Sequence, residues 1–375
     1  MRRGLPLALL WAIGASYLAL VARYSLAGVS PGNDFAAFYA ASRLVLDGHA
    51  GDVFDMARMV AMEHAVAGGD GRFPWAYPPV ALLFVAPLGL VPYLPALAAW
   101  LAATTLPLLL IIRRLTGLSL AVAAIMPAIA HNLSAGQNGA LTATLLAGGA
   151  ALAGCRRPWI AGIMFGLAAY KPQACILIPV CLLAARRYDA LAAMAATVSA
   201  LVGLSFVLFG WGPWEGFLVH LGGHMDFVAA GKLPFNRFPT MFAAVLKLTG
   251  ERPVAEGAQV ASTMLAGLVV WRVWRGSASL AHRLLALAVA MPLATPFLLE
   301  YDLALTAVPA AFIFQSAWRG EAMAPVDWAA LVVLWVLPPM IWAASLEGLA
   351  VGLPLAALLS IYAIGLAARS RPSWP

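Results

Sequence analysis

The sequence is poor in charged residues. They make up 10% of its 375 positions, whereas 63% of the positions are hydrophobic. A soluble globular chain carries about 25% charged residues. Since so few charged side chains cannot cover a surface of this size, the composition excludes a water-soluble protein and predicts an integral membrane protein.

Cysteine is also scarce, and acids are fewer than bases. Cys155, Cys175 and Cys181 lie in or beside apolar segments without C-x-x-C spacing, which excludes a disulfide framework and a cysteine zinc site. The excess of 23 basic over 16 acidic residues has no soluble domain to form a basic face, so nucleic acid is not a predicted partner. No carboxylate cluster demands a divalent cation, and we predict no metal and no cofactor.

What the sequence has is a succession of apolar runs from Leu5 to Ala368. A helix of about 20 apolar residues crosses a hydrocarbon core about 30 Å thick. We therefore predict an all-α, polytopic integral membrane protein with about 11–12 transmembrane or half-spanning helices, in a single domain over residues 1–375. The first run, Leu5 to Val21, is longer than the apolar core of a signal peptide, so we predict an uncleaved first helix.

Arginines in the short loops orient these helices. Basic residues in short loops stay on the cytoplasmic side, which puts both termini in the cytoplasm and leaves two long outer loops, 28–77 and 211–254. The acids were not used to set this orientation, yet only three of the 16, Asp189, Glu321 and Asp327, fall inside under it. We interpret this segregation as a working site on the outer face of the membrane.

Both outer loops carry apolar residues at helical spacing, and we predict short amphipathic helices lying on the outer leaflet and walling a cavity. The residues are Phe35, Phe38, Tyr39 and Leu46 in the first loop and Trp214, Phe217, Leu218 and Leu221 in the second.

Two predicted spans are interrupted. Prolines 87, 92 and 95 break the stretch 78–112, which predicts a short interfacial or re-entrant piece before the full span. The stretch 158–185 is interrupted only by Tyr170-Lys171-Pro172-Gln173. Two half-length helices meeting at Lys171 fit this pattern, with the lysine inside the membrane or near its outer boundary.

Asp34 follows the first predicted span and precedes a predicted helix at Phe35. One interpretation is a helix N-cap. The other is a general base that takes a proton from an acceptor hydroxyl while a bond forms to the anomeric carbon of a sugar. The sequence alone favours neither.

Two cations are candidate ligands of a phosphate. An ionisable residue inside a membrane indicates function, and Lys171 at a helix break fits a compact cation beside an anionic leaving group. Snorkelling to the headgroups is the alternative for Lys171. Arg237, in the second outer loop, is the second candidate, with headgroup anchoring as its alternative.

Several other polar residues could belong to the site. His131 precedes a short outer turn in which Gln137 and Asn138 could bind sugar hydroxyls or merely cap a helix. Tyr77 marks a rigid loop exit or borders the cavity. Glu300 and Asp302 are two residues apart, so on a continuous helix they would point to different sides.

A metal is not predicted at the second outer loop. His220 and His224 are four apart with Asp226 nearby, which is metal-like spacing, but Gly222-Gly223 between them weakens the helix, and we interpret them as interfacial histidines.

Seven short motifs together resemble glycosyltransferase family 87, of the GT-C superfamily, over about residues 30 to 310. They are Asp34-Phe35, Phe38-Tyr39-Ala40, Leu46-Asp47-Gly48, Phe54-Asp55, Tyr77-Pro78-Pro79, Gly136-Gln137-Asn138 and Tyr170-Lys171-Pro172-Gln173. The resemblance implies a GT-C-like bundle in the cytoplasmic membrane. It also implies inverting transfer of a hexose, such as mannose, from a polyprenyl-phosphate sugar to a lipid or glycan acceptor at the extracytoplasmic face.

In that family the acidic residue of the first outer loop serves as general base, and Asp34 matches it. Lys171 and Gln173 match the family's polar helix break, for which we expect a donor-phosphate role. A secondary transporter or lipid-linked substrate flippase is the alternative, because transporters also use broken helices. A noncatalytic assembly factor is the third hypothesis.

Overall fold

The apolar sequence folds into helices throughout the part of the chain that the structure describes. The computed structural model describes residues 34–67, 73–155, 157–229 and 237–346, and seven positions of the first apolar run; for 222–229, 339 and 342–346 it describes the backbone alone. These residues contain no β-strand, which confirms the predicted all-α fold. The first and last predicted spans, 5–27 and 350–368, and both termini lie wholly or mostly outside this part.

The helices follow one another with short connections. In chain order the α-helices are α2 (Phe35–Leu46), α3 (Met56–Ala67), α4 (Leu82–Val85), α5 (Tyr93–Thr116), α6 (Leu120–Ala124), α7 (Pro127–Ala135), α8 (Gly139–Ala153), α9 (Pro158–Leu167), α10 (Pro172–Cys175), α11 (Ile178–Ala184), α12 (Tyr188–Phe209), α13 (Gly212–Ala229), α14 (Met241–Thr249), α15 (Arg252–Arg275), α16 (Leu280–Ala294), α17 (Ala307–Trp318) and α18 (Pro325–Leu346). The 3₁₀ segments are η1 (Ala50–Phe54), η2 (Pro79–Ala81), η3 (Ala86–Leu90), η4 (Ala168–Tyr170) and η6 (Glu300–Thr306).

Three described helices, α5, α12 and α15, are each long and apolar enough to cross a membrane. Others are shorter: α8 and α16 have 15 residues each, which at about 1.5 Å per residue is roughly 22 Å. The apolar run near 280–299 is longer than the helix it contains. α16 stops at Ala294 because Thr295 precedes Pro296 and is extended, with φ −133° and ψ 141°.

Both predicted interruptions are present. Residues 79–90 form the short pieces η2, α4 and η3 before the long helix α5, as the prolines predict. Lys171 separates α9 and η4 from α10, with φ −131° and ψ 73°. Its extended φ follows from Pro172, whose ring disfavours helical backbone in the preceding residue.

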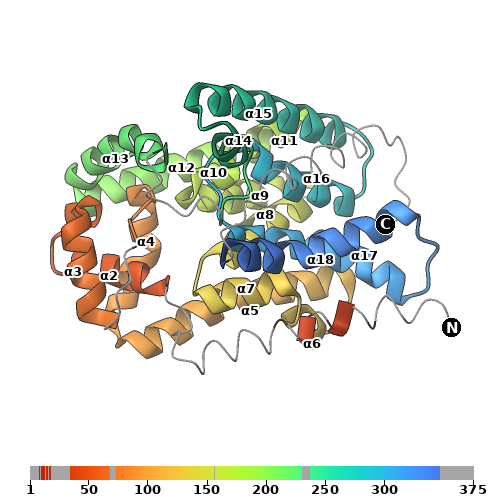
Figure 1. Ribbon diagram of the computed structural model, residues 1–375, viewed down its shortest axis with the longest axis horizontal. Helices are drawn as coiled ribbons and strands as arrows, with labels where there is room; N and C mark the ends of the chain where they lie inside the picture. Colours follow the sequence, from red (N-terminus) through yellow and green to blue (C-terminus); the bar gives the residue numbers. More distant parts are fainter. Residues whose placement is uncertain are drawn as a thin grey trace.

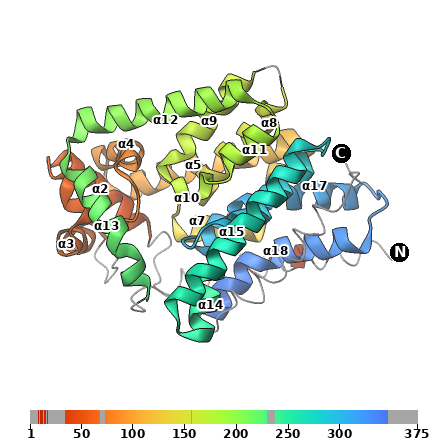
Figure 2. The ribbon, with the colours of Figure 1, turned by 90° about the horizontal axis from the view of Figure 1, so that it is seen from above.

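Small residues allow the helices to pack closely. A Cβ on Gly162 of α9 would lie 2.2 Å from the carbonyl oxygen of Ala190, and one on Gly166 would lie 2.5 Å from Cβ of Thr197. α9 and α12 therefore run side by side in the same direction, in nearly backbone-to-backbone contact (Figure 2). Close approach at glycine is the usual way that helices associate where water supplies no hydrophobic driving force.

Three helices of the two predicted outer loops gather at one end of the long axis, whereas α14, also in the second loop, packs against α15. Figures 1 and 2 both place α2, α3 and α13 at that end. The prediction that the first of them lies on the outer leaflet with one apolar face is wrong for α2. Its residues from Phe35 to Ser42 are buried on all sides, while Leu46 is exposed, because α4, η3 and α3 pack around the helix.

Candidate active site

Asp34 begins α2, but its carboxylate does not cap the helix. The residue occupies the N-cap position with helical backbone angles, and its side chain makes no capping hydrogen bond. Instead Oδ2 accepts a hydrogen bond of 3.0 Å from Nε2 of Gln137 and lies 3.9 Å from a guanidinium nitrogen of Arg237. Burial raises the pKa of Asp34 above its ordinary value, and the charge of Arg237 and the bond from Gln137 oppose that rise. The alternative that Asp34 is only a helix cap is therefore wrong.

The turn between α7 and α8 supplies the amides. Gly136 ends α7 in the left-handed region at φ 72°, and its carbonyl oxygen accepts a bond of 3.1 Å from the indole of Trp100. Gln137 and Asn138 follow, and both are buried. A Cβ on Gly139 would lie 2.2 Å from the carbonyl oxygen of Tyr301, so only glycine lets this turn approach the 300–302 segment so closely.

Lys171 is buried at the helix break, with 2% of its side chain exposed. Its ammonium forms an ion pair with Asp302 and donates a bond of 3.0 Å to Oδ1 of Asn138. The ammonium also lies 5.6 Å from the ring centroid of Tyr77 and 5.0 Å from that of Tyr301. A buried charge needs such partners, because an unpaired one would cost several kcal/mol. Snorkelling to lipid headgroups, the alternative interpretation of Lys171, is excluded by this burial.

Glu300 and Asp302 lie on opposite sides of η6, as their spacing predicts. Asp302 reaches Lys171, whereas Glu300 accepts bonds of 2.8 and 2.6 Å from Arg237 and lies 3.4 Å from Nε2 of His131. In a 3₁₀ segment residues two apart are separated by about 240° around the axis. Burial alone would raise the pKa of Glu300, but the charge of Arg237 and the bond from His131 outweigh it and lower the value to about 2.

Arg237 connects the two acids and keeps contact with the outside. It bonds Glu300 and lies beside Asp34, while 25% of its side chain remains exposed. Behind Glu300, Nδ1 of His131 shares a hydrogen bond of 2.5 Å with the hydroxyl of Tyr17. The site therefore has one accessible cation, Arg237, and one enclosed cation, Lys171, among the residues just described.

Most of the predicted residues meet in this one place. The hydroxyl of Tyr77 donates a bond of 3.5 Å to Oε1 of Gln137 and so links the residues around Lys171 to those around Asp34. With this bond, the contacts form one continuous chain through Asp34, Tyr77, His131, Gln137, Asn138, Lys171, Arg237, Glu300 and Asp302. Gln173 does not join it: its side chain is half-buried on α10 and makes no hydrogen bond within the described residues. His220 packs against the ring of Phe54, and the side chains of His224 and Asp226 lie outside the described part.

Three residues near the site were not among the site residues predicted from the sequence. Glu63 of α3 is 1% exposed, and its Oε2 accepts a bond of 3.1 Å from the backbone of Phe73. The sequence could have indicated Glu63, because it follows Met59 by four residues and so shares the buried face of α3. Tyr17 and Gly139 have no such local signal, because their partners His131 and Tyr301 are more than a hundred residues away in the chain.

The model of glycosyltransferase family 87 matches residues 75–296, more than half of the chain. No curated protein and no solved structure matches this chain. The matched range contains Tyr77, Gln137, Lys171 and Arg237, whereas Asp34 lies before it. The contact between Asp34 and Gln137 links the unmatched acid to the matched region.

Proposed function

The chain belongs to glycosyltransferase family 87 and is a membrane glycosyltransferase, and from this premise we propose its donor, its acceptor class and its base. The donor is a polyprenyl-phosphate hexose, with mannose as the proposed sugar. The acceptor is a hydroxyl of a lipid or glycan. Because the family fixes an enzyme class, a transporter and a noncatalytic assembly factor are no longer alternatives.

The main support for the proposal is that the Asp34 carboxylate does not cap its helix and is available to accept a proton. It makes no bond to the helix that it begins, and only Oδ2 has the contacts to Gln137 and Arg237 described above. A carboxylate held in this way can accept a proton without losing its position.

The proposed reaction is a single displacement. The acceptor oxygen attacks the anomeric carbon and gives its proton to Asp34, the bond from that carbon to the phosphate oxygen breaks, and polyprenyl phosphate leaves with the electron pair. Attack from the face opposite the leaving group inverts the anomeric configuration. The negative charge on the leaving phosphate requires a cation close to it.

Arg237 is our choice for that cation. Its guanidinium presents several donors to a phosphate and is partly exposed, whereas the ammonium of Lys171 is enclosed by Asp302, Asn138 and two rings. Lys171 is then a positioning residue that holds the turn at Asn138 against the 300–302 segment. Its own contact with the donor phosphate stays a prediction.

Two buried polar atoms support sugar binding nearby. Oε2 of Glu300 and Nδ2 of Asn132 have no hydrogen-bond partner among the described residues. A buried polar atom without a partner costs about 1–3 kcal/mol, so these two atoms are suited to hydroxyl groups that arrive with the substrate. Gln137, Asn138 and Tyr77 complete the proposed sugar-binding wall.

We place the site at the extracytoplasmic face of the cytoplasmic membrane, with both termini in the cytoplasm. Support comes from α8 and α16, each roughly 22 Å long, which have site residues at one end and arginines near the other. If the arginine end faces the cytoplasm, the site lies near the outer boundary of the hydrocarbon.

The test uses purified protein, a panel of polyprenyl-phosphate sugars and detection of released polyprenyl phosphate. Asp34→Asn should lower turnover by about a hundredfold to ten-thousandfold, the range that a general base contributes. Asp47→Asn, at the exposed end of the same helix, is the matched control and should leave turnover unchanged. Full turnover by a folded Asp34→Asn variant would exclude Asp34 as the base.

A further inference from the structure

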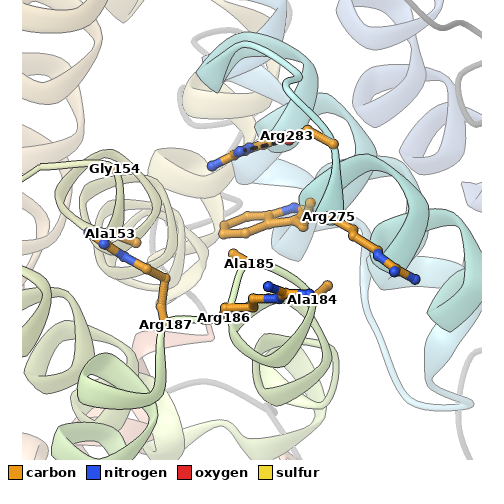
Figure 3. A pocket seen from close by; sticks show the side chains of 10 residues that line it. Ala153, Gly154, Ala184, Ala185, Arg186, Arg187, Arg275 and Arg283 are labelled. Carbon is orange, nitrogen blue, oxygen red and sulfur yellow. Dashed lines mark hydrogen bonds between the residues drawn. The ribbon is translucent and has the colours of Figure 1, made fainter.

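A second polar site lies among the arginines, away from Asp34. It is a pocket of about 430 Å³ between the ends of α8, α11 and α15 and the start of α16. The residues that line it are Ala153, Gly154, Ala184, Ala185, Arg186, Arg187, Trp274, Arg275, Gly276 and Arg283. Figure 3 shows Arg186, Arg187 and Arg283 around the pocket, each from a different side, while the Arg275 side chain extends away from them.

The pocket is strongly positive. Four of its lining residues are arginines and none is Asp or Glu. No described acid forms an ion pair with any of the four, although four other described arginines do pair with acids elsewhere in the molecule. Positive charges that line one pocket repel one another unless an anion lies between them.

Several donors in the pocket are buried without partners. The Nε atoms of Arg187 and Arg283 and the indole nitrogen of Trp274 are enclosed and have no hydrogen-bond partner among the residues that the structure describes. Three such donors beside one cavity are unusual, because folded proteins pair almost all buried donors. All three belong to side chains that line the pocket.

The half-buried side chains of Arg187 and Arg283 are already held in place. A terminal nitrogen of Arg187 donates a bond of 2.9 Å to the carbonyl oxygen of Cys155, and one of Arg283 donates a bond of 3.1 Å to that of Gly276. Arg283 also lies over the indole of Trp274, 5.7 Å from its ring centroid. Binding an anion would therefore cost little side-chain ordering.

This pocket is separate from the candidate active site. Asn138 and Ala153 lie at opposite ends of α8. Arg283 lies near the start of α16, whereas Glu300 follows the other end of that helix, in η6. Each helix has 15 residues, so roughly 22 Å separates the two sites. The donor phosphate that we place at Arg237 cannot reach the arginines of this pocket.

We propose that the pocket binds a phosphate group, and that the headgroup of an anionic phospholipid is its source. Guanidinium forks match phosphate oxygens, and basic pockets between membrane helices at the cytoplasmic side bind anionic headgroups. The surroundings resemble a membrane interface: Tyr188, next to Arg187, and Trp271, one turn before Arg275, are exposed. Aromatic residues of this kind gather at the level of the headgroups.

The experiment compares lipid retention by native mass spectrometry of full-length protein in detergent. Phosphatidylglycerol is the lipid probe, phosphatidylcholine the zwitterionic comparison and inorganic pyrophosphate the soluble probe. Arg187→Gln with Arg283→Gln should weaken phosphatidylglycerol binding about tenfold or more, since each basic residue contributes about 1 kcal/mol at a membrane surface.

The matched control is Arg113→Gln with Arg114→Gln at the exposed end of α5. This end is on the same side, because α5 runs parallel to α8, with Trp100 bonded to Gly136 and Ile111 packed near Gly148. The control removes the same charge without touching the pocket and should retain phosphatidylglycerol almost fully. Equal losses in both double variants would overturn the proposal.

Two further measurements distinguish a lipid from a soluble phosphate ligand and keep the test valid if the glutamine variant does not fold. Stabilisation by pyrophosphate, lost in the pocket variant and unaccompanied by lipid retention, would support the phosphate site and assign it to a soluble ligand. If the glutamine variant does not fold, Arg187→Lys with Arg283→Lys keeps the charge but loses the forked donors, and should bind phosphatidylglycerol about threefold more weakly. Unchanged lipid binding by the lysine variant would then overturn the proposal.

Discussion

At the scale of single residues, the site depends on how one guanidinium is shared between two acids. Arg237 lies 2.6 Å from Glu300 and 3.9 Å from Asp34. The closer contact lowers the pKa of Glu300 and keeps this acid ionised. The more distant contact only opposes the rise that burial causes in the pKa of Asp34. The difference suits a site in which one acid stays ionised and the other exchanges a proton with the acceptor.

This arrangement predicts the effect of Arg237→Gln on pH dependence. Removing the cation takes away an interaction that lowers the pKa of Asp34, so that pKa should rise further. A base must be deprotonated, and the acidic limb of the kcat/KM profile should therefore move to higher pH. The KM for the donor should increase about tenfold, because a charged hydrogen bond to phosphate contributes about 1.5–3 kcal/mol.

The measurement is the rate of polyprenyl-phosphate release across the pH range, with Arg252→Gln as control. Arg252 pairs with Glu256 at the start of α15, outside the site, and its loss should change neither quantity. An acidic limb that moves to lower pH in Arg237→Gln would contradict the proposed coupling to Asp34.

The sequence predicted most of the site residues but not their pairing. Ionisable groups in an apolar chain are few, so Asp34, Lys171, Glu300 and Asp302 stand out by composition alone. Their partners are set by tertiary contacts: Lys171 and Asp302 are 131 positions apart, and Gln137 is 103 from Asp34. No local pattern fixes such distances, so the sequence does not reveal that Asp302 is the partner of Lys171.

At the scale of elements, the broken helix at Lys171 is joined to η6 by a buried ion pair and to α8 by a hydrogen bond. Lys171 comes from the break between η4 and α10, Asp302 from η6 and Asn138 from the start of α8. Burying two charges is expensive, and losing one partner leaves the other uncompensated. Loss of either charge should therefore destabilise the place where these three elements meet.

Lys171→Met and Asp302→Leu, singly and together, test this dependence. Each single change should destabilise the protein by about 3–5 kcal/mol, and the double change should restore much of that loss, because no buried charge remains unpaired. Thermal unfolding in detergent measures the stability, and donor turnover of the double variant is the second readout.

Turnover separates a positioning role from direct phosphate binding. If Lys171 only positions the turn, the folded double variant should keep a donor KM within about threefold of the original. A stable double variant with a donor KM raised about a hundredfold would instead support contact between Lys171 and the phosphate. Single variants as stable as the original would contradict the ion pair itself.

Helix positions were predictable where prolines and apolar runs define them. The break at Lys171 and the short pieces at 79–90 follow from Pro172 and from Pro87 and Pro92. The burial of α2 was not predictable, because its surroundings come from α3, α4 and η3 rather than from its own amphipathic pattern. Hydropathy does not show where α16 ends, because Phe297, Leu298 and Leu299 continue the apolar run beyond Pro296.

At the scale of the whole molecule, the two sites divide the protein into a carboxylate end and an arginine end. α5 and α8 run in the same direction, and both end near arginines or the arginine pocket. Three helices of the two predicted outer loops, α2, α3 and α13, gather at one end of the long axis (Figure 1). We propose that the arginine end faces the cytoplasm, since short basic loops remain on that side.

Cysteine labelling of intact cells tests the orientation. Cys155 is exposed next to the arginine pocket, whereas Cys175 and Cys181 are buried. A membrane-impermeant maleimide should leave Cys155 unlabelled in intact cells and label it after permeabilisation. In a Cys155→Ser background, Asp47→Cys at the exposed end of α2 should be labelled in intact cells, because this residue lies at the end of the molecule that we place outside. The reverse labelling pattern would invert the topology and move the proposed site to the cytoplasmic face.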